Sequence, residues 1–170
     1  MESFTIDCRG ISAEADGMNI DFKWSRLDSL ATLELYEIIS ARESVFVVEQ
    51  NCPYQETDGM DLHAWHLSAF MDGELAAYAR VVDPGVKYSE PSIGRVMTVN
   101  KFRGQKIGRR LVEEAIKFTE TTFPMSGIRI GAQVYLKRFY ESLGFRSVGE
   151  VYDEDGIPHI DMIRPGNCVA

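Results

Sequence analysis

The sequence predicts a single α/β domain of the α+β type, in which a mixed β-sheet carries helices on its faces. Three observations support this fold class. The chain has 170 residues, which is enough for one well-buried core and too few for two. Two alternating apolar segments are joined by a tight turn, which is typical of an antiparallel hairpin. The second half then alternates strand-like with helix-like segments, as in sheets that have helices packed against them.

The composition is that of a globular protein with an acidic surface. Hydrophobic residues make up 45% of the chain and charged residues 26%, which excludes bulk disorder. Lys and Arg together number 18 against 26 Asp and Glu, so the net charge is −8. Because a duplex nucleic-acid binder must neutralise phosphates, this balance argues against nucleic acid as a partner. An anionic ligand would need a locally basic exception.

The sequence also limits the location of the protein and the kinds of site it can contain. No apolar run approaches the length of a membrane span, and the acidic N-terminus lacks the layout of a signal peptide. We therefore expect a cytoplasmic protein with no membrane partner. The three widely spaced cysteines, Cys8, Cys52 and Cys168, suit reduced thiols better than a disulfide framework or a zinc site. No metal is expected.

The first half of the chain is expected to form a strand, a helix and a hairpin. Residues 1–17 have no apolar period and are predicted to be an N-terminal extension to a domain at 18–170. Asp28 or Ser29 would cap a helix, because apolar residues recur after them at three- and four-residue intervals. The pair Asp72-Gly73 can adopt positive φ and predicts a hairpin turn. The expected elements are a strand at 18–24, a helix from 28 or 29 toward 45, a loop at 51–61 and paired strands at 64–71 and 74–82.

The second half changes between strand and helix periodicity. Apolar residues at 107, 111, 115 and 118 mark one face of a helix that Pro124 ends. Gly144 is a good residue to end a second helix. The expected elements are strands at 92–99, 128–133, 146–152 and 158–164, with helices from 107 and at 135–143 and a turn at 153–156.

The segment from Asn100 to Leu111 is the basic exception in an acidic chain. It contains no acid and has a local charge of +5, carried by Lys101, Arg103, Lys106, Arg109 and Arg110. Gly104 and Gly108 lie where a strand ends and a helix begins, so free backbone N–H groups and the positive end of the helix dipole should face one point. A pyrophosphate fits there, and a solvated basic helix start is the alternative. The P-loop and dinucleotide-binding glycine motifs are absent.

This segment carries a resemblance to a known family. The run from Val99 to Leu111 resembles the acetyl-CoA pyrophosphate loop of the GNAT-type N-acetyltransferases, whose pattern is Gln/Arg-x-x-Gly-x-Gly/Ala. Arg103 and Gly108 match the pattern, and Lys106 stands where it has its middle glycine. The run Phe-Tyr-Glu-Ser-Leu-Gly-Phe at 139–145 is similar to the family's second helix signature. Three further blocks, at 45–54, 93–96 and 154–159, resemble the ElaA-like branch.

The resemblance implies a GNAT fold, with a mostly antiparallel sheet and helices on both faces, and direct transfer of an acetyl group from acetyl-CoA to an amine. In such proteins the strand before the loop splays from its neighbour and pairs with the pantetheine arm. A backbone N–H near Met97 would hold the donor carbonyl, and Arg103 and Arg109 would contact the pyrophosphate. Gln133 would bind pantetheine or substrate, or satisfy loose backbone groups. The cofactor-binding residues expected are Val96, Met97, Thr98, Val99, Arg103, Gly104, Gln105, Lys106, Ile107, Gly108, Arg109 and Gln133.

The catalytic residues expected are an acid and one of three bases. Tyr140 matches the family position of the acid that protonates the leaving thiolate, although a tyrosine beside Phe139 can equally pack the helix onto the sheet. The amine acceptor needs a base, for which Glu49, His66 and His159 are candidates. The structural alternatives are a local hydrogen bond for Glu49 and a hydrogen-bonded role in the core for each histidine.

Several alternatives stay open at this level. Arg42 and Arg95 would orient an acidic group of the substrate or pair with Glu49. Because of Lys106, a catalytically degenerate module that only binds acyl-CoA is the first rival to the enzyme. A protein whose basic segment contacts another macromolecule is the second. The identity of the amine, and whether the protein is a monomer or a homodimer, are not predicted.

Overall fold

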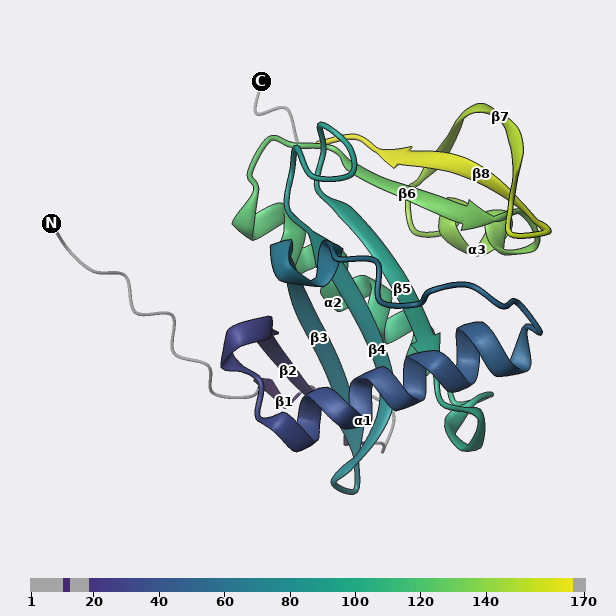
Figure 1. Ribbon diagram of the computed structural model, residues 1–170. Coiled ribbons are helices and arrows are strands. Elements are labelled where there is room, and N and C mark those ends of the chain that lie inside the picture. Colours follow the sequence, from purple (N-terminus) through teal and green to yellow (C-terminus); the bar gives the residue numbers. More distant parts are fainter. Residues whose placement is uncertain (1–10, 13–18, 167–170) are drawn as a thin grey trace, which may run out of the picture.

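The protein, seen here as a computed structural model, is described at residues 11–12 and 19–166. One mixed sheet runs through this part of the chain in the strand order β1-β2-β3-β4-β5-β6-β8-β7 (Figure 1). Its strands are β1 (Ile11–Ser12), β2 (Asp21–Arg26), β3 (Ala64–Met71), β4 (Glu74–Val82), β5 (Ser92–Thr98), β6 (Ile128–Gln133), β7 (Arg146–Glu154) and β8 (Ile157–Arg164). Neighbouring strands are antiparallel except for β5 and β6, which are parallel.

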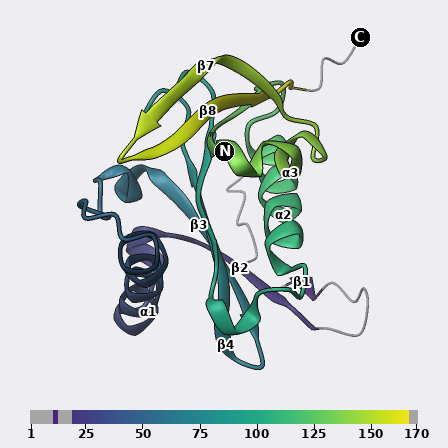
Figure 2. The same ribbon diagram turned by 90° about the vertical axis from the view of Figure 1, so that its right-hand side faces the viewer.

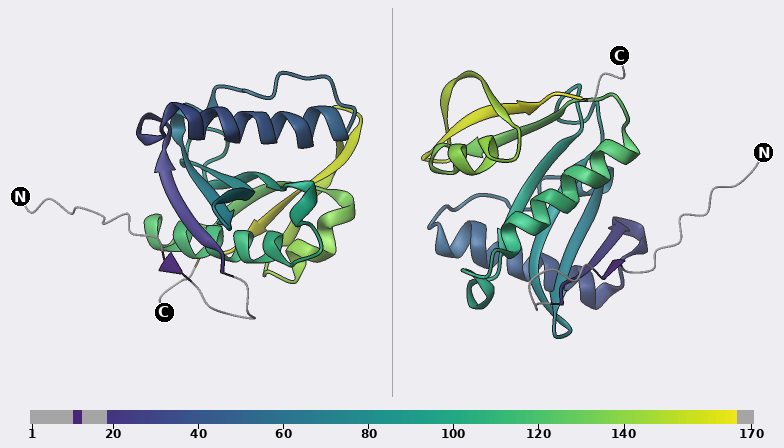
Figure 3. Two further views of the ribbon diagram at one scale, coloured as in Figure 1. Left: turned by 90° about the horizontal axis from the view of Figure 1, so that it is seen from below. Right: turned by 180° about the vertical axis from the view of Figure 1, so that it is seen from behind.

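Helices cover both faces of this sheet. The helices are α1 (Thr32–Glu43), which continues as a π-helix, η2 (Ser44–Glu49), then α2 (Ile107–Thr122) and α3 (Lys137–Glu141). Short 3-10 turns are η1 (Leu27–Ser29), η3 (Met60–His63), η4 (Asn100–Phe102) and η5 (Val134–Leu136). Seen edge-on, α1 lies on one side of the sheet and α2 and α3 on the other (Figures 2 and 3). The predicted fold class, a mixed and mostly antiparallel sheet with helices on both faces, is confirmed.

Most predicted elements are present, and the differences lie at their ends. The hairpin strands at 64–71 and 74–82 have the predicted bounds. The first helix begins at Thr32, because Leu27–Ser29 form a separate turn and the Glu34 carboxylate accepts a hydrogen bond from the Ala31 N–H at 3.1 Å. The predicted helix at 135–143 is shorter, because its first residues form η5.

The final hairpin is longer than predicted, and the N-terminal prediction is only partly described. Strands β7 and β8 extend to a two-residue turn at Asp155-Gly156, where both residues have positive φ. This backbone conformation matches a tight hairpin turn. Most of the predicted extension at 1–17 lies outside the described residues, as do Cys8 and Cys168. Ile11–Ser12, however, pair with β2 as a short edge strand.

Two apolar cores hold the layers together. On one face, the apolar side of α2, with Ile107, Leu111 and Ala115, is buried against the sheet. On the other face, Ile38 of α1 packs with a smaller cluster that includes Tyr78 and Met97. Burial of each Leu, Ile or Met side chain contributes roughly 1.5–3 kcal/mol, so the two cores fix both helical layers on the sheet.

The sheet opens between β5 and β6, and this opening positions the site. The two strands pair only at Ser92 and Arg129 and then diverge (Figure 1). A bulge interrupts β5, since its register with β4 shifts between the pairs Tyr78–Met97 and Arg80–Gly94. Arg95 lies in this bulge with a φ of 50°. A bulge inserts an extra residue and bends its strand, so β5 turns away from β6.

Candidate active site

A cavity of about 830 Å³ lies at the opening between β5 and β6. Its walls come from η2, the segment after it, the end of β4, β5, the last residues of β6 and the β7–β8 turn. We call residues 51–63, which join η2 to β3, the strap. We call this hollow the acceptor cavity, for the role proposed below.

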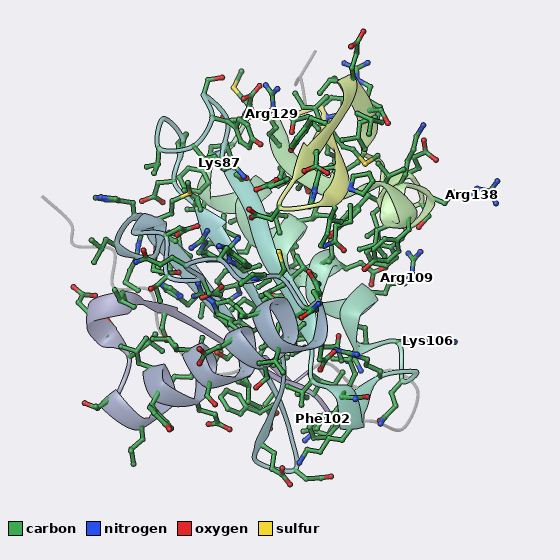
Figure 4. The ribbon with its side chains drawn as sticks, turned by 45° about the vertical axis from the view of Figure 1, so that its right-hand side comes forward. Lys87, Phe102, Lys106, Arg109, Arg129 and Arg138 are labelled. Atoms are coloured by element: carbon green, nitrogen blue, oxygen red, sulfur yellow. The ribbon has the colours of Figure 1, made fainter. Side chains whose placement is uncertain are left out.

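A second hollow of about 650 Å³ lies at the start of α2, and we call it the loop groove. It is lined by the end of β5, the loop at 102–109 and three residues of η5 and α3. Figure 4 shows Phe102, Lys106 and Arg109 along this side of the molecule. Six residues line both hollows, so the two meet at the opening in the sheet: Val96, Met97, Thr98, Arg103, Leu136 and Tyr140.

The backbone of the loop accommodates a lysine where the family pattern has glycine. Gly104 and Lys106 both have left-handed φ angles, 81° and 58°, and Lys106 is the N-cap residue of α2. This conformation costs a non-glycine residue roughly 1–2 kcal/mol, yet the chain adopts it. A Cβ on Gly108 would lie 3.3 Å from the Thr98 Oγ1, so the glycine allows the start of α2 to approach the end of β5 closely.

The predicted cofactor residues fall into two groups. Val99 and Gln105 line neither hollow. The Val99 N–H instead donates to the Ala76 carbonyl at 2.9 Å, and its side chain packs against the α1-side core. The other predicted cofactor residues line the loop groove, the acceptor cavity or both, and Gln133 lines only the cavity. The guanidinium of Arg109 lies 5.6 Å from the centroid of the Phe139 ring, across the groove.

Tyr140 lies where the two hollows meet. Its ring is 7% exposed and makes edge contacts with Phe139 and Phe145, at centroid distances of 5.0 and 5.8 Å. Burial raises the pKa of Tyr140 to about 12, because a phenolate is poorly solvated inside the protein. The phenol is therefore protonated at neutral pH. Tyr140 thus packs α3 onto the sheet, as the structural interpretation expects, and also lines both hollows.

Glu49 lines the acceptor cavity and is held by the loop. Its carboxylate accepts a hydrogen bond from Arg103 at 2.7 Å, and the Arg103 Nε donates to the Thr98 carbonyl at 3.0 Å. The side chains of Arg103 and Glu49 are 44% and 34% exposed. The structural alternative for Glu49 was a local hydrogen bond. Glu49 instead forms an ion pair with Arg103, which is distant in the sequence.

His66 lies away from both hollows, so the structure does not support it as a catalytic residue. It is 1% exposed, and its Nδ1 and Nε2 lie 2.7 Å from the Tyr78 hydroxyl and 3.1 Å from the Asp61 carbonyl. A carbonyl only accepts, so Nε2 carries the proton and Nδ1 accepts from the hydroxyl. Burial lowers the pKa of His66. Both ring nitrogens have hydrogen-bond partners. His66 therefore fits the hydrogen-bonded core role that was the alternative to catalysis.

His159 lines the acceptor cavity in a defined tautomer. Its Nδ1 lies 2.8 Å from the Ile157 carbonyl. Because that carbonyl can only accept, Nδ1 carries the proton and a neutral ring has its lone pair on Nε2. The ring stacks on Tyr152 at 6.0 Å with an angle of 25°. Among the described residues, no hydrogen-bond partner of Nε2 is found, so this nitrogen is free to accept a proton.

Three arginines and three acids of the strap form a balanced network beside the cavity, which sequence reasoning missed. The arginines come from α1, β4 and β5 and are Arg42, Arg80 and Arg95; the acids are Glu56, Asp58 and Asp61. Each arginine pairs with two of the acids, at N–O distances of 2.6–3.2 Å. The open choice for Arg42 and Arg95 is therefore decided, since both pair with Glu56 and not with Glu49.

The arginines of this network lower the pKa values of Asp58 and Asp61. Burial by itself would raise the pKa of Asp58, but the hydrogen bond and charge of Arg80, with the charge of Arg95, lower it to about 2. Asp61 has its pKa lowered in the same way against burial, mainly by Arg42. These acids are ionised at neutral pH, so they neutralise the arginines that border the cavity. The signal in the sequence was the occurrence of three acids, Glu56, Asp58 and Asp61, in a segment otherwise typical of a loop.

In the part of the chain that the structure describes, no three His, Cys, Asp or Glu side chains are placed to hold a metal ion. Within residues 19–166 no helix is long and apolar enough to span a bilayer.

Comparison with known proteins identifies the family. Residues 36–164 match the acetyltransferase (GNAT) domain. The chain is 41% identical to the protein ElaA of Escherichia coli over 146 residues, 84% of this chain and 95% of that protein. It is also 41% identical to a UPF0039 protein of Synechocystis over 147 residues, 86% of this chain and 96% of that protein.

Solved structures agree with this match. The fold is similar to that of an acyl-CoA N-acyltransferase from Pseudomonas aeruginosa, with a TM-score of 0.82 and 42% identity over 85% of this chain and 99% of that one. The crystal structure of Escherichia coli ElaA gives a TM-score of 0.80. The chain thus belongs to the GNAT family of acetyltransferases, within its ElaA-like branch, and is an acyltransferase.

Proposed function

We propose that this protein is an N-acetyltransferase that transfers the acetyl group of acetyl-CoA directly to an amine. The observation that carries the proposal is the meeting of the loop groove and the acceptor cavity at the opening between β5 and β6, with Tyr140 lining both. A thioester and an amine that enter from opposite sides would meet at this opening. Holding two reactants in such an arrangement removes much of the entropic cost of their encounter.

The loop groove fits the CoA part of the donor. The basic side chains of Arg103, Lys106 and Arg109 line it together with the backbone at the start of α2, and this combination suits a pyrophosphate. Apolar walls from Phe102 and Phe139 suit the less polar parts of CoA. The edge of β5 beyond Ser92 has no partner strand on the β6 side, so pantetheine amides can pair with it as an added strand.

The chemistry is a balanced transfer from sulfur to nitrogen. The amine nitrogen attacks the thioester carbonyl carbon, a C–N bond forms and the C–S bond breaks. Tyr140 gives its proton to the departing thiolate, for which a protonated phenol is a suitable donor. The amine loses a proton to a base. Because the amine itself attacks the thioester, no acyl-enzyme is formed.

Of the remaining base candidates, His159 fits the role better than Glu49. The Nε2 lone pair of His159 is available in the cavity, since Nδ1 donates to the Ile157 carbonyl. The carboxylate of Glu49 is occupied by Arg103. We therefore assign the role of proton acceptor to His159. Glu49 would instead hold the Arg103 side chain in position.

The experiment is a measurement of thiol release from acetyl-CoA in the presence of a panel of primary amines, with the acetylated amine identified by mass spectrometry. Acetylated product with matching thiol release supports the proposal. CoA binding by calorimetry without thiol release on any amine would support a module that only binds acyl-CoA. If calorimetry shows no CoA binding at all, both the acetyltransferase and the acyl-CoA-binding module are excluded.

A further inference from the structure

The acceptor cavity is roofed on its α1 side by contacts between segments far apart in the sequence. Just after η2, the Gln50 side chain accepts a hydrogen bond from Gln133 of β6 at 3.3 Å. Two residues later, the Cys52 thiol donates to the carbonyl of Asp155, in the β7–β8 turn, at 3.3 Å. Figure 2 shows this turn reaching across to the strap. The two halves of the splayed sheet are therefore joined again above the cavity.

The loop before α2 makes a third connection to the same roof. Glu49, next to Gln50, pairs with Arg103 at 2.7 Å. Residues 49–52 thus contact the basic loop, β6 and the β7–β8 turn in succession. All the side chains in these contacts, and Asp155, line the acceptor cavity. An extended polypeptide lying across the opening would have to displace these contacts.

The strap that continues from this roof is anchored and not free to swing away. Its Glu56 is 7% exposed and pairs with Arg42 of α1 and Arg95 of β5. Asp58 and Asp61 both pair with Arg80 of β4. Breaking a buried ion pair leaves an uncompensated charge and is strongly destabilising. Moving the strap to open the cavity would therefore have a large free-energy cost.

The size of the cavity and the roof on its α1 side point to one class of acceptor. A volume of about 830 Å³ falls within the range of small-molecule pockets, roughly 300–1,000 Å³. A lysine in a folded protein brings its flanking backbone with it and needs an open groove, whereas a small amine can enter end-on. We propose, resting on the acetyl-transfer function above, that the acceptor is a small primary amine and not a lysine or N-terminus of a polypeptide.

The first test compares acceptors with the unmodified enzyme. Thiol release from acetyl-CoA is measured with small aliphatic and aromatic primary amines, with a peptide that has a free N-terminus, with an N-blocked lysine peptide and with a folded lysine-rich protein. We expect kcat/KM for the best small amine to exceed that for each polypeptide by about tenfold or more. A polypeptide used as well as, or better than, every small amine would overturn the inference and leave the acetyl-transfer function intact. Thiol release with none of these acceptors would instead count against that function.

The second test removes two of the contacts that form the roof. Gln50→Ala removes the contact with Gln133, and Cys52→Ala removes the contact with the β7–β8 turn. For the double variant, we expect the ratio of kcat/KM for the N-blocked lysine peptide to that for the small amine to rise several-fold. Ser40→Ala, at an exposed α1 position that lines neither hollow, is the matched control and should keep the original ratio. Thermal unfolding checks that each variant folds, and an unchanged ratio in the folded double variant would overturn the role of the roof.

Discussion

The carboxylate of Glu49 accepts a hydrogen bond from the guanidinium of Arg103 at 2.7 Å, so the end of η2 is joined to the loop that precedes α2. This pair connects the two sides of the opening in the sheet. Because both side chains are more than a third exposed, solvent screens the pair and its contribution to stability is below about 1 kcal/mol. The pair matters because it holds the Arg103 guanidinium where the loop groove and the acceptor cavity meet.

Replacing Arg103 should weaken the binding of CoA. Arg103→Ala removes a charge that faces both hollows, and a charge-assisted hydrogen bond contributes roughly 1.5–3 kcal/mol, so we expect Kd for CoA to rise about tenfold or more. The dependence of Kd on salt should also weaken. Calorimetry at low and high salt measures both. Lys101→Ala makes the same charge change in the same segment, but Lys101 pairs with Glu74 and lines neither hollow, so it is the control. Equal CoA affinity in Arg103→Ala and the parent protein would contradict the assignment.

Tyr140→Phe should reduce turnover while leaving CoA binding nearly unchanged. The substitution keeps the buried ring and removes only the proton donor, so kcat should fall about a hundredfold. Since burial raises the pKa of Tyr140 to about 12, the phenol stays protonated through neutral and moderately alkaline pH, and deprotonation of this group should not lower kcat there. Tyr36→Phe, on the exposed side of α1, is the control. A kcat equal to that of the parent enzyme would remove Tyr140 as the acid.

His159→Ala should lower kcat/KM about a hundredfold, because general-base catalysis typically contributes that much or more. His63, exposed in η3 and lining neither hollow, gives the matched control His63→Ala. Steady-state rates with the best amine measure both, together with Glu49→Gln. If Glu49→Gln abolishes turnover while His159→Ala does not, then Glu49 is the base and the assignment based on the tautomer is wrong.

Asp58→Asn should destabilise the fold and change its response to acid. The pKa of Asp58 is lowered to about 2 in the folded state from roughly 3.9 in an unfolded chain. Its ionised form therefore adds stability above about pH 4, and this stability is lost as the pH falls toward 2. The side chain is 23% exposed, and we expect the variant to lose about 2 kcal/mol at neutral pH.

Denaturant unfolding at neutral pH and near pH 2 measures this difference. The free energies of unfolding of Asp58→Asn and the parent protein should nearly converge at the lower pH, because about half of the parent's Asp58 is then protonated in the folded state and most of the stability from its ionised form is lost. Asp21→Asn, at an exposed position in β2, is the control and should cost much less. A constant difference between Asp58→Asn and the parent at both pH values would show that ionisation of Asp58 is not the source of the stability.

Local patterns were sufficient to predict the elements and the family. The alternation at 64–82 with the Asp72-Gly73 turn predicted both hairpin strands, and the spacing from Ile107 predicted α2. The ends of elements were predicted less well. At Leu27–Ser29 and Val134–Leu136 the competing structure is a 3-10 turn, and its short-range hydrogen bonds give no apolar period that would distinguish it from a helix.

The candidate site was only partly accessible from the sequence. The loop at 103–109 was found because its charge and glycines are local. His66 and His159 looked equivalent, since each is a histidine in a predicted strand or beside a turn. Their different roles depend on whether each ring borders the acceptor cavity and on which atom accepts from its nitrogen.

Composition, periodicity and short motifs were sufficient to predict the fold class, the family and the position of the basic loop. Which charges meet depends instead on the folded arrangement. Glu56 lies 39 residues from Arg95, and Cys52 lies 103 residues from the carbonyl that it contacts. Such contacts are set by how β5 bends at its bulge and how the strap returns over the sheet, and no local spacing encodes either one. For the same reason the roof over the acceptor cavity, and with it the inferred size of the amine, follows from the folded arrangement alone.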